Sequence, residues 1–445
     1  MKDKKPTILI RIPQLIHGQM LDDLRRPHPY AEERVGFLHT TSKVLADNTV
    51  LIIATEYIPV EDENYIDDDR VGAKINSVAI RAAMQRSLER KGGCFHVHLH
   101  DHRGQPGPSR TDKNGLPGVV ESLANIAPAQ ANGFLILSQN SFYASIKILG
   151  EKEFLQPNAV SVVGKPMLLS FTGEKGFKSR VYDRQSFLGE SSQFLFENIR
   201  VGIIGYGGGG SHIGQQLAHI GVKNIAIFDD DKVEDTNLNR LVGAWFSDVK
   251  NALLKTAVAE RVIKNILPTA NVVRVNTRWQ DNPDLLQACD VVFGNIDSYA
   301  ERQQAEAECR RFLIPYIDIG MDVYQIDDDP HAIAGQVILS LPGFPCMSCF
   351  GFLTEKKLAQ EAAKYGKVGG RPQVVWPNGV LASTAVGLFV NLVTNWTQDN
   401  ETPDYLSYNG NTGMIQQHVR TQYLTSKDCS HFLPDQVGAP VFVKL

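Results

Sequence analysis

The residues with the clearest chemistry are three glycines that follow a short apolar run. Gly205, Gly207 and Gly210 in VGIIGYGGGG have the G-x-G-x-x-G spacing that joins a strand to a helix. The first glycine allows a tight turn, the second lets the backbone approach a phosphate, and the third packs the helix on the strand. Backbone N–H groups at the start of such a helix face an anion. Residues 201–240 therefore predict a strand, a phosphate-binding turn, a helix and a second strand.

Polar residues that follow the second strand are not part of the usual dinucleotide-binding motif. Asp229 ends that strand, where an acid accepts hydrogen bonds from a ribose. A redox dinucleotide leaves Asn237 and Arg240 unexplained, whereas Arg forks onto phosphate oxygens. Lys255, on a following helical stretch, adds a point charge, and Asp297 follows a third buried strand as a candidate magnesium ligand. The set predicts a triphosphate site.

Alternating histidines form a second candidate site, in CFHVHLHDHRGQPGPSRTD, at His96, His98, His100 and His102. Alternate residues of a strand share a face, so at least the first pair points one way. Two histidines and a carboxylate, for which Asp112 is a candidate, make a zinc set that leaves one position for water. In a dry core each histidine would need a hydrogen-bond partner, which favours the metal interpretation.

The spacing of apolar residues predicts the strands and helices that position these side chains. Alternating strand and helix patterns over residues 205–315 predict a doubly wound, mostly parallel α/β sheet with ligands at the strand carboxyl ends. In the first part of the chain, residues 8–12 and 50–54 predict strands and residues 75–91 a helix. An apolar helix is expected over residues 381–393.

Late strands are expected over residues 404–419. Residues 171–196 predict a linker followed by a helix, in which Arg180 and Arg184 lie one turn apart and share a face.

Composition bounds the class of protein. The chain has 445 residues, enough for two or three domains of about 150 residues. A net charge of −4 gives no electrostatic reason to expect nucleic acid. No membrane span is expected, because no apolar run reaches the ~20 residues needed. Six cysteines do not suggest a disulfide framework, and the N-terminus has no signal-like stretch, so a cytoplasmic protein is expected.

The motifs GYGGGG, DDDKVEDTNLNR, Lys255 and NIDSYAER resemble, in this order, those of the ThiF/MoeB/HesA family of adenylyltransferases, the core of ubiquitin-activating enzymes. The match covers residues 180–345. It implies an enzyme that binds ATP and Mg²⁺ and adenylates the C-terminal glycine carboxylate of a ubiquitin-like protein. The implied nucleotide-binding residues are Gly205, Gly207, Gly208, Gly210, Asp229, Asp231, Asn237, Arg240, Lys255 and Asp297.

The same resemblance assigns catalytic roles. Arg240 and Lys255 would stabilise charge on the phosphates, and Asp297 would hold the metal. The segment RVYDRQ, which ends in Arg184 and Gln185, resembles the arginine segment that this family donates across a homodimer to the ATP of the other subunit. A solvated basic face is the alternative for these arginines.

The histidine stretch resembles the JAB/JAMM (MPN-like) metalloprotease family, which removes or trims ubiquitin-like proteins. AEERVGFLH supplies a glutamate before a strand, and Ser109 begins the Ser-x-x-Asp pattern. The resemblance implies zinc ligands at His96, His98 and Asp112, with Glu33 as general base and Ser109 beside the oxyanion.

Two features depart from the JAB/JAMM pattern. Leu99 stands where the family has proline, and the interval from His98 to Ser109 is about three residues too long. Choosing His98 and His100 as the pair leaves an interval one residue too long. We prefer His96 and His98, because the Gly-x-aromatic context before them fits better. A JAB-shaped docking module without metal is the alternative.

A second metal site is expected near the end of the chain. Cys346 and Cys349 have CxxC spacing, and Cys429 and His431 follow in KDCSHF. The ThiF-type family often clips its tail with a structural zinc, so the resemblance implies a Cys3His site. A reactive thiol at Cys429, or two unrelated cysteine pairs, are the alternatives. Because no cysteine stands clear of zinc and core explanations, the chain is expected to stop at the acyl-adenylate or to hand it to the thiol of a conjugating-enzyme-like partner.

These patterns divide the chain into a JAB-like α/β domain (1–172), a linker with an arginine-bearing helix (173–198), a ThiF-type adenylation domain (199–395) and a zinc-clipped tail (396–445). The combination is similar to bacterial ubiquitin-like conjugation or sulfur-carrier systems, some tied to antiviral defence. One alternative is an adenylyltransferase for a sulfur carrier or a peptide, with the JAB domain as a docking module. Another is a nicotinamide-dependent oxidoreductase.

Overall fold

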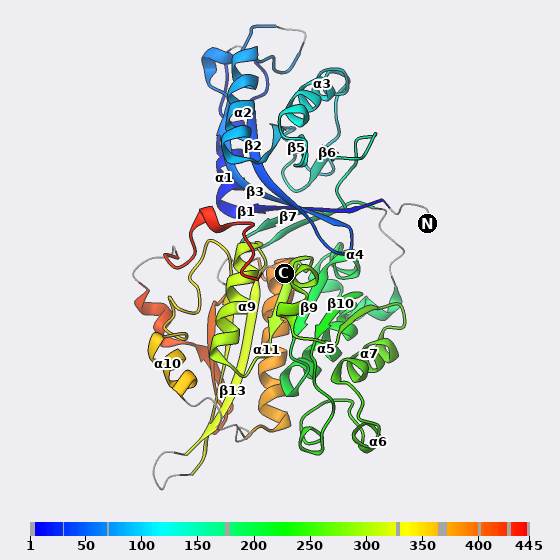
Figure 1. The fold of residues 1–445 in the computed structure, drawn as a ribbon, viewed down its shortest axis with the longest axis vertical. Helices are drawn as coiled ribbons and strands as arrows, with labels where there is room; N and C mark the ends of the chain where they lie inside the picture. The colour runs from blue at the N-terminus through cyan, green and yellow to red at the C-terminus, as the bar shows by residue number, and fades with distance from the viewer. Residues whose placement is uncertain are drawn as a thin grey trace. The chain divides into compact units, whose positions relative to one another are not determined.

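The chain forms two compact units (Figure 1). The first comprises residues 1–164 and 168–174, and the second comprises residues 165–167 and 175–445. The computed structural model describes residues 5–29, 31–68, 71–173, 179–325, 330–363, 372–398, 402–424 and 429–442. Residues 174–178 of the predicted linker lie outside the described residues.

The first unit is built on a mixed eight-stranded sheet with the order β6-β5-β4-β2-β3-β1-β7-β8. Its strands are β1 Thr7–Pro13, β2 Val35–Val44, β3 Thr49–Pro59, β4 Gly93–Leu99, β5 Asn132–Leu137, β6 Phe142–Lys147, β7 Ala159–Val163 and β8 Leu168–Phe171. Its helices are α1 Gln14–Leu24, α2 Ser77–Arg90 and α3 Arg110–Ile126, with a 3-10 turn at Asp62–Asn64. The strands predicted at residues 8–12 and 50–54 and the helix predicted at residues 75–91 are confirmed.

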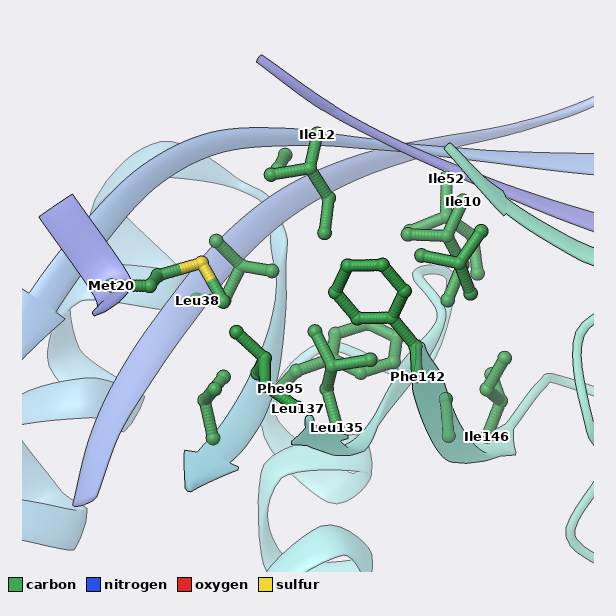
Figure 2. Packing of buried hydrophobic residues seen from close by; sticks show 14 of the residues in the cluster. Ile10, Ile12, Met20, Leu38, Ile52, Phe95, Leu135, Leu137, Phe142 and Ile146 are labelled. Carbon is green, nitrogen blue, oxygen red and sulfur yellow. The ribbon is translucent and has the colours of Figure 1, made fainter. Parts of the chain in front are cut away.

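Strand β4 separates the two faces of this sheet. Phe95 and Val97 point into the core under α1, and Figure 2 shows Phe95 in the same buried cluster as Met20 of that helix and residues of neighbouring strands. Cys94 points the other way and packs against α2 and α3. Because side chains alternate along a strand, His96 and His98 share the face of Cys94. The sheet thereby delivers both histidines to the side that α3 covers.

The second unit contains another eight-stranded sheet, with the order β11-β10-β9-β12-β13-β14-β15-β16. The strands from β11 to β13 pair in parallel, and those from β13 to β16 pair antiparallel. The strands are β9 Arg200–Ile204, β10 Asn224–Phe228, β11 Asn271–Val275, β12 Val291–Gly294, β13 Tyr316–Tyr324, β14 Ala332–Ser340, β15 Tyr405–Asn409 and β16 Met414–Gln417. The doubly wound parallel region and the late strands are confirmed.

Helices cover both faces of this sheet. On β13, Asp318 pairs with Arg302 of α9, whereas the next residue, Ile319, lies against Gly209 of α5. Since neighbouring strand residues face opposite sides, α5 and α9 lie on opposite faces. The helices are α4 Ser192–Asn198, α5 Gly208–Ile220, α6 Phe246–Lys250, α7 Lys255–Ile266, α8 Pro283–Gln287, α9 Tyr299–Arg311, α10 Glu355–Ala363 and α11 Val375–Thr394, with 3-10 turns at Arg180–Leu188, Asp235–Asn237, Trp279–Asp281, Val419–Tyr423 and Pro434–Gln436.

Helix α11 corrects one expectation. Among the described residues it is the one helix long and apolar enough, by length and composition alone, to cross a membrane, although no apolar run was expected to reach that length. However, 61% of its most apolar window is buried inside the structure, where it packs against α5, β13 and β14. Core packing explains why this helix is apolar on most of its surface.

The arginine-bearing segment also differs from expectation. Residues Arg180–Leu188 form a 3-10 helix with a kink at Gln185, not an α-helix. A 3-10 helix has about three residues per turn, so side chains four apart do not align. Arg180 and Arg184 are both exposed and do not share one face. Gln185 is held instead by a 3.0 Å hydrogen bond from its amide to the carbonyl of Ile220.

We expect Phe95→Ala to lower the free energy of unfolding by about 3–5 kcal/mol, because the ring is 1% exposed and its removal leaves a cavity beneath α1. The free energy of unfolding is measured by urea titration, with cleavage of the first unit by trypsin as the readout of unfolding. Val78→Ala is the matched control: that side chain is 52% exposed on α2, and its truncation should shift stability by about 0.5 kcal/mol or less. Equal effects of the two substitutions would contradict this core assignment.

Candidate functional site

A cleft lies where β9, β10 and β12 end. Because β9 is flanked by β10 on one side and β12 on the other, the strand order reverses here, which is where doubly wound sheets bind ligands. The cleft opens to solvent, and together with the solvent space at its mouth it measures about 750 Å³. It is lined by every predicted nucleotide-binding residue except Gly210, namely Gly205, Gly207, Gly208, Asp229, Asp231, Asn237, Arg240, Lys255 and Asp297.

The glycine turn forms one wall of the cleft. Gly205 has a φ of +80°, and a Cβ there would lie 2.5 Å from the carbonyl oxygen of Asn295. A Cβ at Gly210 would lie 2.1 Å from the carbonyl oxygen of Gly205, which explains why Gly210 packs behind the turn and does not line the cleft. At Gly207, the N-cap of α5, a Cβ would meet no heavy atom within 4 Å. The backbone there is open to a ligand.

Asp229 is fixed at the carboxyl end of β10. Its Oδ2 accepts a 2.6 Å hydrogen bond from the backbone N–H of Tyr206, and its Oδ1 accepts one of 2.9 Å from that of Asp231. Burial raises the pKa of Asp229, and the Lys255 ammonium opposes this shift. Lys255 Nζ lies 2.6 Å from Asp231 Oδ2 and 4.0 Å from Asp229 Oδ1. The cation is therefore held at the cleft wall by the strand-end acids.

The loop after β10 brings an amide and a guanidinium to the same cleft. Buried Asn237 accepts a 3.1 Å hydrogen bond at Oδ1 from the N–H of Glu234, which closes the 3-10 turn. Arg240 donates from Nη1 to the carbonyl of Thr236 at 2.6 Å. A Cβ on Gly208 would lie 3.4 Å from Arg240 Cδ, so the arginine lies directly against the glycine turn.

Asp297 follows β12 on the opposite wall, where its Oδ1 accepts a 3.3 Å hydrogen bond from the side chain of Gln373. The backbone carbonyl of Gln373 accepts a 3.1 Å hydrogen bond from Asn239. Gln373 thus connects the two sides of the cleft. It is one of three polar lining residues that sequence reasoning missed, with Asn295 and Asn378.

Arg302 also lines the cleft, but its guanidinium is already held by contacts within the protein. Its guanidinium pairs with fully buried Asp318 and donates from Nε to the carbonyl of Ile296 at 2.7 Å. Burial raises the pKa of Asp318 to about 6, and Arg302 opposes that shift. This ion pair holds the strand ends that carry the site. Arg184, by contrast, does not line the cleft of its own chain.

The predicted Cys3His residues converge. Sγ–Sγ distances are 3.6 Å for Cys346–Cys349 and 3.7 Å for Cys349–Cys429, and His431 Nδ1 lies 3.5, 3.3 and 4.0 Å from Cys346, Cys349 and Cys429. Zinc bonds of about 2.3 Å to sulfur and 2.0 Å to nitrogen place tetrahedral ligand atoms roughly 3.5–3.8 Å apart. The four donors therefore fit a structural metal ion that clips the tail to the loop after β14.

The histidine strand also forms a cluster, with a different histidine pair from the preferred one. Ligand atoms of Glu33, His98 and His100 lie within 4.8 Å of one another. Asp112 Oδ1 is 3.6 Å from His98 Nε2, and its Oδ2 is 3.9 Å from His100 Nε2. The centre of the His96 ring is 5.7 Å from that of His98, and His96 is outside the cluster. The structure thus brings the carboxylates to His98 and His100.

The Ser-x-x-Asp pattern has a structural use here. Ser109 Oγ accepts a 3.1 Å hydrogen bond from the N–H of Asp112, and Asp112 Oδ2 accepts one of 2.7 Å from the N–H of Ser109. This is a capping box that begins α3. The cap fixes Asp112 with its other oxygen toward His98.

Several known proteins are similar to this chain. A model of the ThiF family matches residues 180–431. Ubiquitin-like modifier-activating enzyme 5 of Drosophila ananassae is 25% identical over 238 residues, which is 48% of this chain and 55% of that protein. The SAMP-activating enzyme E1 of Haloferax volcanii is 28% identical over 191 residues, which is 42% of this chain and 67% of that protein.

Among solved structures, E. coli MccB with ATP has a TM-score of 0.44 and 21% identity over 54% of this chain and 71% of that chain. This chain spans about half the length of the curated relatives that it matches.

A glycine turn, a strand-end acid, an arginine and a lysine at a switch point are typical of a nucleotide-binding, doubly wound domain. The chain belongs to the ThiF family, whose model matches more than half of it, and its second unit is an E1-like adenylyltransferase domain. The family implies ATP as the nucleotide.

Replacing Cys346 with Ser should remove one equivalent of bound zinc, because three donors retain a tetrahedral zinc poorly, and should lower the melting temperature by several degrees. Elemental analysis of the purified protein measures the zinc. Cys309→Ser, at a buried cysteine outside the cluster, should keep the zinc content of the unaltered chain. An unchanged zinc content in Cys346→Ser would exclude this site.

Proposed function

We propose that the second unit uses ATP to adenylate the C-terminal carboxylate of a ubiquitin-like protein. The observation that carries this proposal is the assembly of Asp229, Asn237, Arg240, Lys255 and Asp297 around the glycine turn in one cleft. An oxidoreductase would need the ribose acid and the glycines but not two phosphate-directed cations. The similarity to enzymes that activate ubiquitin-like modifiers supports a protein carboxylate as the acceptor.

In the proposed reaction, a carboxylate oxygen of the substrate attacks the α-phosphorus of ATP. An acyl–phosphate bond forms, the bond to the β-phosphate breaks, and pyrophosphate leaves. Negative charge builds on the phosphate oxygens, where Arg240, Lys255 and the backbone N–H groups after Gly207 stabilise it. Lys255 exchanges its contact with Asp231 for a phosphate oxygen. Mg²⁺, held by Asp297, would neutralise charge on the departing pyrophosphate.

We also propose that Arg184 acts in the cleft of a second subunit of a homodimer. Its exposure and its absence from the cleft of its own chain support a role across a subunit boundary. None of the six cysteines stands ready to form a thioester: Cys94, Cys289 and Cys309 are buried, and the other three belong to the Cys3His cluster. The acyl-adenylate would therefore pass to a thiol of another protein.

Asp297→Ala and Arg240→Ala should each reduce ATP–pyrophosphate exchange, measured with a glycine-tailed ubiquitin-like protein from the same genome, by about 100- to 1000-fold. Each removes roughly 3 kcal/mol of charge stabilisation from the transition state. Asp281→Ala removes an exposed carboxylate outside the cleft and should retain exchange within about twofold. Near-normal exchange in both cleft variants would refute the assignment.

We propose a second activity for the first unit, zinc-dependent cleavage behind the glycine tail of the same class of protein. The convergence of Glu33, His98, His100 and Asp112 supports it. Glu33, His98 and Asp112 also line a solvent-open groove, which His96 lines as well. His98, His100 and Asp112 would hold the ion, which would polarise the scissile carbonyl. Glu33, 3.8 Å from His100 Nε2, is placed to accept the proton of the attacking water.

The zinc content of histidine variants distinguishes the pair His98 and His100 from the pair His96 and His98. His98→Ala and His100→Ala should each lower bound zinc from two equivalents to one, because each removes a donor that faces the carboxylates. His96→Ala should retain both equivalents, as should His102→Ala, the matched substitution at the exposed end of the series. Loss of zinc in His96→Ala with retention in His100→Ala would show that the pair preferred from the sequence is correct.

A further inference from the structure

A group of cations and aromatic rings extends from the floor of the ATP cleft. Arg302, which lines the cleft, places its guanidinium carbon 5.6 Å from the centre of the Phe352 ring. On the same ring lies the ammonium of Lys357, at 4.7 Å, and this ammonium is also 5.2 Å from the ring centre of Tyr299. Tyr299 follows the cleft residue Asp297 by two positions. Phe352 and Tyr299 therefore connect Lys357 to the cleft.

The group continues across β15. The Phe352 ring contacts Tyr405, with ring centres 6.4 Å apart, and Tyr405 stacks on His418 at 4.0 Å with an interplanar angle of 10°. His418 Nδ1 accepts a 3.1 Å hydrogen bond from the backbone N–H of Arg420. We call this group the basic aromatic patch; its members are Tyr299, Phe352, Lys357, Tyr405, His418 and Arg420. Phe352 and Tyr405 are buried beneath it, and the other four members reach solvent.

The cations of this patch lack a matching acid. Among the described residues, neither Lys357 nor Arg420 forms an ion pair; Lys357 Nζ donates to the carbonyl of Phe352 at 2.9 Å, and Arg420 donates to backbone carbonyls. Glu361, one turn along α10 from Lys357, directs its oxygens to the start of α9, at 3.0 Å from the N–H of Tyr299. The cation of Arg302 is already matched by Asp318.

Electrostatics agree with this geometry. Burial lowers the pKa of Lys357, and the nearby Arg420 and Arg302 cations lower it further. The positive charges therefore repel one another in the isolated chain. An anion placed between Lys357 and Arg420 would relieve this repulsion and gain Coulomb attraction in a partly desolvated site. Lys357 retains two N–H donors, and the guanidinium of exposed Arg420 also retains donors for it.

In the proposed reaction, the substrate must also contact the protein outside the cleft. The reacting carboxylate must reach the cleft, so the residues before it must lie on the surface leading away from the cleft. We propose that the basic aromatic patch docks an acidic segment of the protein substrate, lying shortly before its reacting C-terminal carboxylate. This inference rests on the adenylation proposed above. Lys357 and Arg420 would pair with the acidic side chains, and the half-buried rings of Tyr299 and His418 would pack against the peptide between them.

The test uses the full chain and two synthetic decapeptides that end in Gly-Gly, one with two glutamates at positions four and six from its end and one with glutamines there. Calorimetry in the presence of AMP should show at least tenfold tighter binding of the glutamate peptide. Lys357→Glu and Arg420→Glu should reduce that preference to less than threefold. Lys356→Glu, which makes the same charge change at the adjacent exposed residue of α10, should retain it.

Binding of ATP provides the reference measurement. It should stay within about twofold in Lys357→Glu, as measured by the same method. Arg420 also donates hydrogen bonds to backbone carbonyls, so its substitution could lower stability as well as peptide binding. Lys357→Gln avoids this ambiguity: it should reduce the preference for the glutamate peptide without changing the melting temperature. Equal binding of both peptides to the unaltered chain would overturn the docking proposal while leaving adenylation intact. A loss of ATP affinity as large as the loss of peptide affinity would place Lys357 in the nucleotide site instead.

Failure of the unaltered chain to bind ATP would refute the proposed function itself. A rise in the glutamate peptide's dissociation constant with ionic strength, absent for the glutamine peptide, is the second expected result.

Discussion

The close approach of three strand ends is the constraint on which the second unit depends. Gly205 turns with a positive φ beneath the Asn295 carbonyl, and Gly210 packs against the carbonyl of Gly205 with no room for a side chain. This packing draws the start of α5 onto the end of β9 and leaves Gly207 open to the cleft. Acids, amides and cations from later segments then reach the same point because parallel strands end along one edge of a sheet. A wider turn would separate the helix N–H groups from the strand-end acids.

Helix α9 connects these strand ends to the Cys3His cluster. Near its start, Arg302 and Asp318 fix the strands that end at the cleft. One and two turns later, Glu306 accepts a 2.8 Å hydrogen bond from the N–H of Met347, and Arg310 donates to the carbonyl of Phe344 at 2.7 Å. Those two contacts fix the loop that carries the CxxC pair. One helix therefore contacts both the strands that end at the cleft and the loop that carries Cys346 and Cys349. The cleft and the Cys3His cluster should depend on the packing of this helix.

The sequence was most informative where a signal is local. The glycine spacing, the strand-end Asp229 and the CxxC pair each lie within a few residues, and the structure brings them to the positions that such patterns imply. It was least informative where contacts span distant segments. Gln373 lies 76 residues from Asp297 along the chain, and no nearby pattern marks it as a cleft residue. The segment Arg180–Leu188 misled for another reason, because four-residue spacing predicts one face only if the helix is α-helical.

At the histidine cluster, the local pattern and the fold favour different histidine pairs. Alternation along β4 predicts a shared face for His96 and His98, and that face is real. But the strand ends at Leu99, and His100, just beyond it, turns toward the open end where Glu33 and Asp112 lie. Burial does not separate the first two histidines, because His98 is 2% exposed and His96 6%. The capping box of α3 fixes Asp112 within 4 Å of both His98 and His100, so a helix cap, more than strand alternation, determines which histidines the carboxylate faces.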